Sequence, residues 1–201
     1  MRLYYAPTSP FARKVRVTVI ELHLEDRVEL VPIDPWTDPE LRRRNPLAKV
    51  PTLVADDGTI LFESTLICEY LDHLAGGSLF PPPGEARWQA LLHLGVADGI
   101  SAAAGRLFAD ERRPADQRAE SVMRRQAEAV AAGLERLESE ADILSDLADI
   151  GAIGAACAVA YLDFRWPERD WRTGHPRLAA WHARMGERES LTRTPYRLLN
   201  A

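Results

Sequence analysis

A segment rich in glycine and proline divides this chain into two parts with different sequence patterns. Residues 76–84 read Gly-Gly-Ser-Leu-Phe-Pro-Pro-Pro-Gly. The glycines end a helix, and the three consecutive prolines prevent another helix from starting. Strand and helix patterns alternate before this segment, whereas every long segment after it has helical period. The pattern predicts an α/β domain over residues 1–75, a linker over 76–84 and an all-helical bundle over 85–201.

The composition is that of a globular protein without a nucleic-acid partner or a membrane span. The 201 residues are 46% hydrophobic and 27% charged, and the formal net charge of -5 disfavours binding to nucleic acid. No apolar run approaches the roughly 20 residues that cross a bilayer, and the N-terminus lacks the apolar core of a signal peptide. We therefore expect a cytoplasmic protein.

The two cysteines and the histidines do not form a metal-binding pattern. Cys68 and Cys157 both fall on apolar faces of predicted helices, which favours buried thiols over a disulfide or a metal pair. No cluster of Cys and His has the spacing of metal ligands. We expect no metal site.

The region around Val50-Pro51 and Glu63-Ser64 can hold a peptide ligand by its backbone and its charged end. An X–Pro bond is where a cis peptide costs least, and a cis Pro51 would expose the main-chain groups of Val50 to an extended peptide. Glu63 and Ser64 precede an apolar stripe with helical spacing, and a helix N-terminus favours a carboxylate. The alternative is structural, with Pro51 making a turn and the Glu63-Ser64 pair capping a helix.

Ser9 stands at the start of another helix. Residues 2–5 have the pattern of a short strand, Pro10 follows Ser9, and an apolar stripe continues to Leu22. A hydroxyl at this position either caps the helix or donates a hydrogen bond to a ligand anion held by the helix dipole.

The second half of the chain has the pattern of packed helices. Two long amphipathic helices are predicted over Ala86–Arg112 and Ala115–Leu137, and a third covers Ile150–Leu162. This third helix has almost no charge and must be buried. Asp146 and Asp149 precede it, and we interpret them as helix caps and not as catalytic residues.

Three motifs of this chain resemble those of the glutathione S-transferase family in its serine-type branch. They are Ser9–Val15, Asn45–Pro51 and Phe62–Ile67, and the likeness to bacterial members extends over the whole chain. The resemblance implies a thioredoxin-like N-terminal domain, an all-helical C-terminal domain and a homodimer. It also implies glutathione as co-substrate and transfer of the glutathionyl group to a small hydrophobic electrophile, or reduction of that electrophile by glutathione.

The resemblance gives Ser9 the catalytic role, because a hydroxyl donor near a helix dipole lowers the pKa of a thiol. Tyr5 is the alternative, since tyrosine-type members keep their hydroxyl at the end of the first strand.

The glutathione-binding residues that the resemblance implies are Lys49, Val50, Pro51, Glu63 and Ser64. Phe11 and Trp166 are candidates for the acceptor pocket. The alternatives to a transferase are a glutathione-dependent peroxidase and a ligandin-like binding or stress-response protein without turnover.

Overall fold

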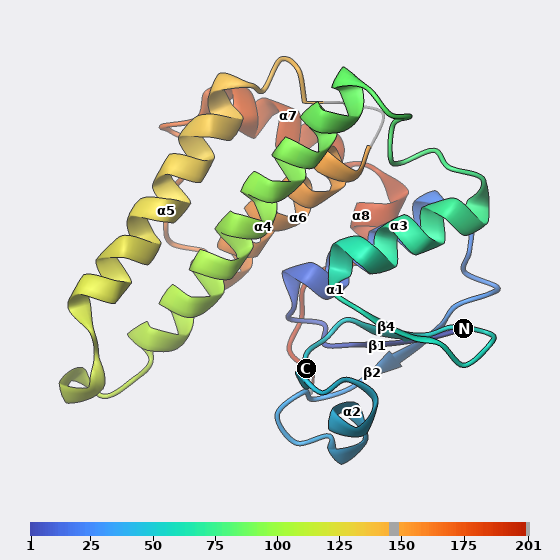
Figure 1. Ribbon diagram of the computed structural model, residues 1–201. Helices are drawn as coiled ribbons and strands as arrows, with labels where there is room; N and C mark the ends of the chain where they lie inside the picture. The colour runs from blue at the N-terminus through green and yellow to red at the C-terminus, as the bar shows by residue number, and fades with distance from the viewer. Residues whose placement is uncertain (145–148, 200–201) are drawn as a thin grey trace. The chain divides into compact units, whose positions relative to one another are not determined.

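The computed structural model describes residues 1–144 and 149–199. The chain forms two compact units, Met1–Pro82 with Glu187–Ala201 and Pro83–Gly186. The first unit contains all the strands of the described residues, and the second contains only helices and their connections (Figure 1). The predicted combination of an α/β part and an all-helical part is confirmed. Residues 187–201, which we assigned to the helical domain, group with the first unit, and the predicted boundaries stay a prediction.

The first unit is built on a four-stranded mixed sheet of order β2-β1-β3-β4. The strands are β1 (Arg2–Tyr5), β2 (Glu29–Pro32), β3 (Thr52–Val54) and β4 (Ile60–Phe62). β1 is parallel to β2 and antiparallel to β3, and β3 is antiparallel to β4. Strand β1 therefore lies inside the sheet, with a hydrogen-bonded neighbour on each side.

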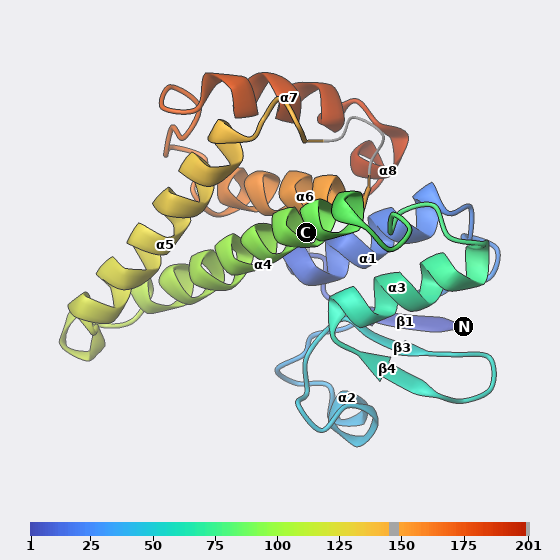
Figure 2. The ribbon, with the colours of Figure 1, turned by 45° about the horizontal axis from the view of Figure 1, so that its top comes forward.

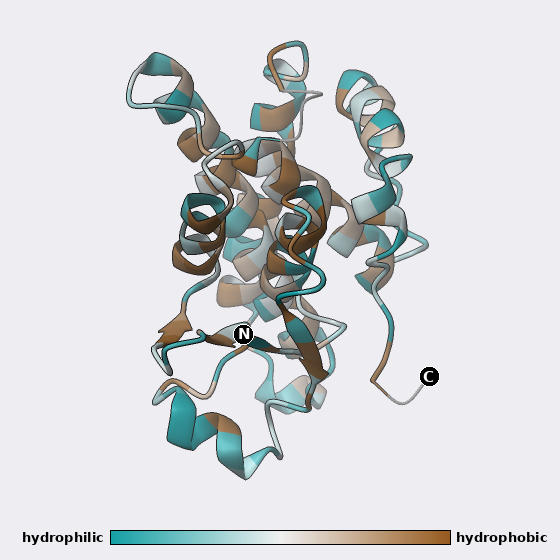
Figure 3. Ribbon diagram, turned by 90° about the vertical axis from the view of Figure 1, so that its right-hand side faces the viewer, coloured by the Kyte–Doolittle hydropathy of each residue, from teal (hydrophilic) through white to brown (hydrophobic). Residues whose placement is uncertain are grey.

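Three helices cover the two faces of this sheet. α1 (Pro10–Glu21) and α3 (Ser64–Ala75) lie on one face, and α2 (Pro39–Arg44) lies on the other (Figures 1 and 2). α2 is hydrophilic over most of its length (Figure 3), and only Leu41 is buried in it. Since strand side chains alternate between faces, Tyr4 packs with Leu41 and its neighbours, while Leu3 points to the opposite face.

Cys68 joins α3 to α1 as a buried thiol. The Thr18 hydroxyl of α1 donates to Cys68 Sγ at 3.3 Å. Cys157 is also buried, and the two cysteines are not joined in a disulfide. The prediction that both thiols are buried is confirmed.

The segment after α3 is fixed to the first unit by Asp72. Gly76 and Gly77 have φ of 98° and 76°, which end the helix in the left-handed region. The buried Asp72 carboxylate then accepts the N–H groups of Ser78 and Leu79, both at 2.8 Å, and that of Phe80 at 3.2 Å. The first half of the predicted linker is therefore anchored by three hydrogen bonds to one side chain.

The C-terminal segment is held to α1 by an ion pair. Glu21 accepts from Arg188 Nε at 3.0 Å and Nη2 at 2.7 Å, and from the Ser190 hydroxyl in the short helix α8 (Glu189–Thr192). Partial burial opposes ionisation of Glu21, but the donors Arg188 and Ser190 outweigh it, and the pKa of the carboxyl lies below its ordinary value. This pairing places residues 187–199 on the first unit.

The second unit contains α4 (Glu85–Glu111), the 3-10 turn η1 (Ala115–Gln117), α5 (Glu120–Ser139), α6 (Ile150–Arg165) and α7 (Pro176–Gly186). The predicted second helix begins later than Ala115, because Arg118 after the turn is extended, with φ -88° and ψ 130°. Its Nε donates to the Arg113 carbonyl at 2.8 Å and fixes the connection.

The apolar helix α6 is buried as predicted. Asp149 caps it by accepting the Ala152 N–H at 2.8 Å, and Asp146 lies outside the described residues. α6 lies along α4 (Figures 1 and 2), and two glycines permit the close approach. A Cβ on Gly154 would stand 2.9 Å from a Leu94 methyl group.

None of the helices in the described part of the chain combines the length and apolarity that a membrane span needs. Residues 1–144 and 149–199 also contain no group of three or more His, Cys, Asp or Glu side chains arranged to hold a metal ion. The cytoplasmic location stays a prediction.

We predict that Gly151→Ala destabilises the second unit by about 3 kcal/mol. A Cβ at Gly151 would lie 2.5 Å from the Ala90 carbonyl oxygen, and a helix backbone cannot move away as a flexible side chain can. Urea unfolding followed by circular dichroism measures the loss. Gly99→Ala is the control: its Cβ meets nothing within 4 Å on α4, so a gain of roughly 0.5–1 kcal/mol is expected. Equal unfolding midpoints for Gly151→Ala and the parent would contradict the packing described.

Candidate functional site

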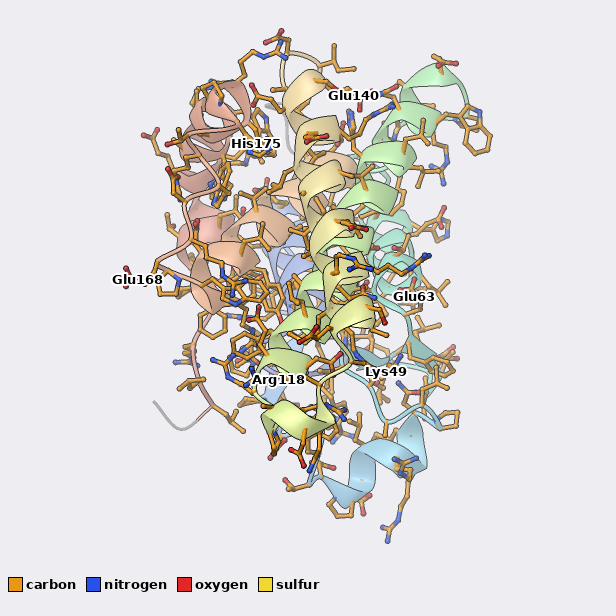
Figure 4. The ribbon with its side chains drawn as sticks, turned by 90° about the vertical axis from the view of Figure 1, so that its left-hand side faces the viewer. Lys49, Glu63, Arg118, Glu140, Glu168 and His175 are labelled. Carbon is orange, nitrogen blue, oxygen red and sulfur yellow. The ribbon has the colours of Figure 1, made fainter. Side chains whose placement is uncertain are left out.

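One pocket of the first unit gathers most of the predicted ligand-binding residues. It has a volume of about 190 Å³. Six of the predicted residues line it, namely Phe11, Lys49, Val50, Pro51, Glu63 and Ser64. Figure 4 labels two of them, Lys49 from the loop before β3 and Glu63 from the start of α3. Residues 50 and 63 are brought together because β3 and β4 pair through Thr52 and Phe62.

The loop before β3 presents its backbone to the pocket. The Val50–Pro51 peptide bond is cis, as predicted. The Val50 side chain packs against the buried cluster of Tyr4, Ile33 and Leu41. Among the described residues, the N–H and C=O of Val50 have no hydrogen-bond partner. A ligand in this pocket would therefore meet the main chain of Val50.

The start of α3 combines a strained backbone with a helix cap. Glu63 has φ of 80°, a left-handed conformation that costs a non-glycine residue about 1–3 kcal/mol. Its Oε2 accepts the Thr65 N–H at 3.1 Å, and its Oε1 lies 3.4 Å from the Ser64 hydroxyl. The capping interpretation is thus observed, and the same residues line the pocket. Strain of this kind persists where the surrounding structure requires it, and it is concentrated at functional sites.

Ser9 caps α1. Its Oγ accepts the Ala12 N–H at 3.2 Å, and Ser9 is partly exposed. This bond uses an oxygen lone pair, so the hydroxyl proton remains available to a second partner. Ser9 does not line the pocket of Lys49 and Glu63. Phe11, two residues later in the first turn of α1, does line it.

The remaining predicted candidates lie elsewhere. Tyr5 is buried, and the Arg16 guanidinium lies over its ring, 4.7 Å from the centroid. Trp166 lines a different pocket that is built wholly from residues of the second unit. Phe11 and Trp166 line different pockets, each within one unit, and their assignment to an acceptor site stays a prediction.

Asn45 positions the loop before β3, a role that the sequence analysis did not assign. It is buried, and its Nδ2 donates to the Lys49 carbonyl at 3.0 Å and to Thr52 Oγ1 at 3.1 Å. Its Oδ1 accepts the Leu47 N–H at 2.9 Å. The signal available in the sequence was an amide side chain before Pro46, between a helix and a strand.

Two buried cations of α1 were also missed. The Arg13 guanidinium donates to the Leu191 carbonyl at 3.1 Å and lies over the Tyr196 ring at 4.5 Å. Lys14 Nζ lies 3.4 Å from the Thr65 hydroxyl at the start of α3. Both hold elements around the candidate site, and neither partner is near in sequence.

Comparison with known proteins identifies relatives along nearly the whole chain. Residues 8–74 match the family described as the glutathione S-transferase N-terminal domain, and residues 120–184 match its C-terminal domain. The uncharacterized GST-like protein YibF of Escherichia coli (strain K12) is 32% identical over 200 residues, which cover 96% of this chain and 98% of YibF.

Two solved structures are similar in fold and sequence. A glutathione transferase family member from Pseudomonas fluorescens Pf-5, with bound glutathione, has a TM-score of 0.93 and 36% identity over 98% of this chain and 99% of that one. A glutathione S-transferase from Methylobacillus flagellatus KT, with GSH bound, has a TM-score of 0.90 and 32% identity over 96% of this chain and 98% of that one.

Proposed function

Because the chain belongs to the glutathione S-transferase family, we propose that it is a glutathione transferase that acts on a small hydrophobic electrophile. The observation that carries the proposal is the pocket of the first unit, where Lys49, Val50, Pro51, Glu63 and Ser64 meet. Glutathione bound in two similar structures supports it. The co-substrate is then glutathione, held by its backbone and its charged groups.

Each part of glutathione has a complementary group in this pocket. The Val50 main chain would pair with the peptide backbone of the ligand. The Glu63 carboxylate would bind the α-amino group, and Ser64 at the N-terminus of α3 would bind the α-carboxylate. Lys49 is exposed at the pocket wall, where it would pair with the distal carboxylate.

Ser9 would activate the thiol. A hydroxyl that donates to the sulfur favours the charged form, and the N-terminus of the 12-residue helix α1 acts in the same direction. Lowering the thiol pKa by two units requires about 2.7 kcal/mol of differential stabilisation. One hydroxyl donor and a helix dipole together supply energies of this size.

The transfer step needs only this thiolate and an electrophile. The sulfur attacks an electrophilic carbon, a carbon–sulfur bond forms, and the leaving group departs with its electron pair. Phe11 lines the same pocket as Glu63 and would give the acceptor an apolar contact.

We predict that Glu63→Gln weakens glutathione binding about tenfold, because the variant keeps an oxygen to cap α3 but loses the charge that attracts the ammonium. Glu63→Ala also loses the cap and should weaken binding further. Calorimetric titration measures both, with Glu69→Gln on the exposed face of α3 as the matched control. Unchanged affinity in both Glu63 variants would refute glutathione binding at this pocket.

Ser9→Ala should raise the pH at which bound glutathione ionises and reduce turnover by about 10²–10³-fold, with little change in affinity. Ultraviolet absorbance of the thiolate gives the titration, and conjugation to chlorodinitrobenzene gives the rate. Ser9→Thr keeps both the cap and the hydroxyl and should restore most of the activity.

Tyr5→Phe is the discriminating control for Ser9. If it shifts the thiolate titration while Ser9→Ala does not, the chain uses the tyrosine-type mechanism. Reduction of an organic hydroperoxide without conjugation would favour the peroxidase, and binding without either turnover would favour the ligandin-like protein.

We propose a homodimer, because α4 exposes large apolar side chains and because the family resemblance implies one. Trp88 and Leu92 lie one turn apart on this helix, and 63% and 57% of their surfaces are exposed. We expect light scattering at micromolar concentration to give twice the chain mass and Leu92→Lys to give a monomer. Ile143→Lys, at a side chain 58% exposed outside α4, should leave the dimer intact. A monomeric parent chain would contradict the proposal.

A further inference from the structure

The helical unit contains an apolar pocket that has no part in the proposed reaction. It has a volume of about 310 Å³ and lies between α4, α5, α6 and the connection that leads to α7. Leu107, Leu134 and Leu162 form its walls together with two indole rings, Trp166 and Trp171. This volume is at the lower end of the range for small-molecule sites, and its apolar lining is typical of them.

The polar ends of the two tryptophans are already bonded, and an arginine lies 4.6 Å from the centroid of each ring, Arg169 over Trp166 and Arg172 over Trp171. The indole surface that remains at the pocket is apolar. Trp166 Nε1 donates to Glu111 at 2.7 Å, and Trp171 Nε1 donates to Asp163 at 2.8 Å. Arg169 forms an ion pair with the same Glu111 at 2.8 Å, so the charges of the two side chains balance. An anionic ligand would therefore find no unbalanced cation among these groups.

Asp170, which also lines the pocket, disfavours an anion further. The Thr173 hydroxyl and the Arg172 N–H both donate to its carboxylate, and they hold the pKa of Asp170 below its ordinary value. A cation is disfavoured as well, because the Arg169 and Arg172 guanidinium groups already lie beside the pocket, over the Trp166 and Trp171 rings. The ligand of this pocket should consequently be uncharged.

His175 supplies one directional polar group. Its Nδ1 lies 2.6 Å from the Trp171 carbonyl oxygen, so Nδ1 carries the proton and Nε2 of the neutral ring has a lone pair. Within residues 1–144 and 149–199, Nε2 has no hydrogen-bond partner. Figure 4 labels His175 just before α7. An acceptor nitrogen at an apolar wall selects a ligand with one O–H or N–H donor.

We propose that this pocket is a second binding site, for a small uncharged aromatic compound of the phenol class. The ring would lie against Trp166 and Trp171, and its hydroxyl would donate to His175 Nε2. The site is built from residues of the second unit alone and shares no lining residue with the glutathione pocket.

The first test compares 1-naphthol with 1-methoxynaphthalene, which has the same ring system but no donor. Calorimetry on the full chain, with S-hexylglutathione present to occupy the catalytic site, should show tighter binding of 1-naphthol. His175→Phe should weaken 1-naphthol binding about two- to tenfold and leave 1-methoxynaphthalene unchanged. Equal binding of the two compounds to the parent chain would overturn the role of His175.

The second test fills the pocket. Gly174 lines it, and a Cβ there meets nothing within 4 Å, so Gly174→Leu can add a side chain at the pocket wall. It should weaken both compounds at least tenfold, and Ala131→Phe on the exposed wall of α5 should do the same. Gly186→Leu, another glycine with open space but outside the pocket, is the matched control.

Two results would refute the site: no binding by the parent chain, or full binding by both filled variants. Displacement of 1-naphthol by S-hexylglutathione would place it in the catalytic site instead. These readouts do not require glutathione turnover, so they stand if the proposed transferase activity fails.

Discussion

The central position of β1 determines where the candidate site forms. Tyr4 of β1 pairs with Thr52 of β3, and Thr52 pairs with Phe62 of β4. Since β3 is antiparallel to both neighbours, the C-terminal ends of β1 and β4 and the N-terminal end of β3 lie at the same edge of the sheet. Ser9 follows β1 in the chain, Val50-Pro51 precedes β3, and Glu63 follows β4. Three segments distant in sequence thus reach one edge because of strand register alone.

The two interpretations that the sequence left open for Ser9 and Glu63 are compatible. Capping a helix requires an oxygen lone pair, which Ser9 gives to Ala12 and Glu63 gives to Thr65. Activating a thiol requires a hydroxyl proton, and binding an ammonium requires a negative charge. A cap therefore leaves the groups needed for chemistry unused, and it fixes the side chain that carries them. The left-handed backbone of Glu63 is an added cost that capping does not explain, because a helix N-cap is normally extended.

Most of the fold and much of the site could be predicted from the sequence, because both depend on local patterns. Helical periodicity identified α1, α3 and the buried α6, and the motifs around Pro51 and Glu63 identified the pocket. Residues 187–199 could not be placed, since α8 has only four residues and its anchor, Arg188 on Glu21, crosses 167 positions. The sequence also could not show that Phe11 and Trp166 line different pockets. Periodicity shows which face of a helix is apolar, but it does not show which helix covers that face.

Small residues have two opposite effects in the helical unit. Where glycine lies between helices, the backbones close together: a Cβ on Gly133 of α5 would stand 2.5 Å from the Ile100 side chain of α4. Ala127 and Ala131, which precede Gly133 on α5, lie beside a pocket instead of a neighbouring helix. An unfilled apolar volume lowers stability through lost contacts, so packing alone does not favour its retention. The indole groups that border it are each oriented by a carboxylate, Glu111 for Trp166 and Asp163 for Trp171. A wall oriented by hydrogen bonds, in which His175 Nε2 has no partner within the described part of the chain, has the organisation of a ligand site more than that of a packing defect.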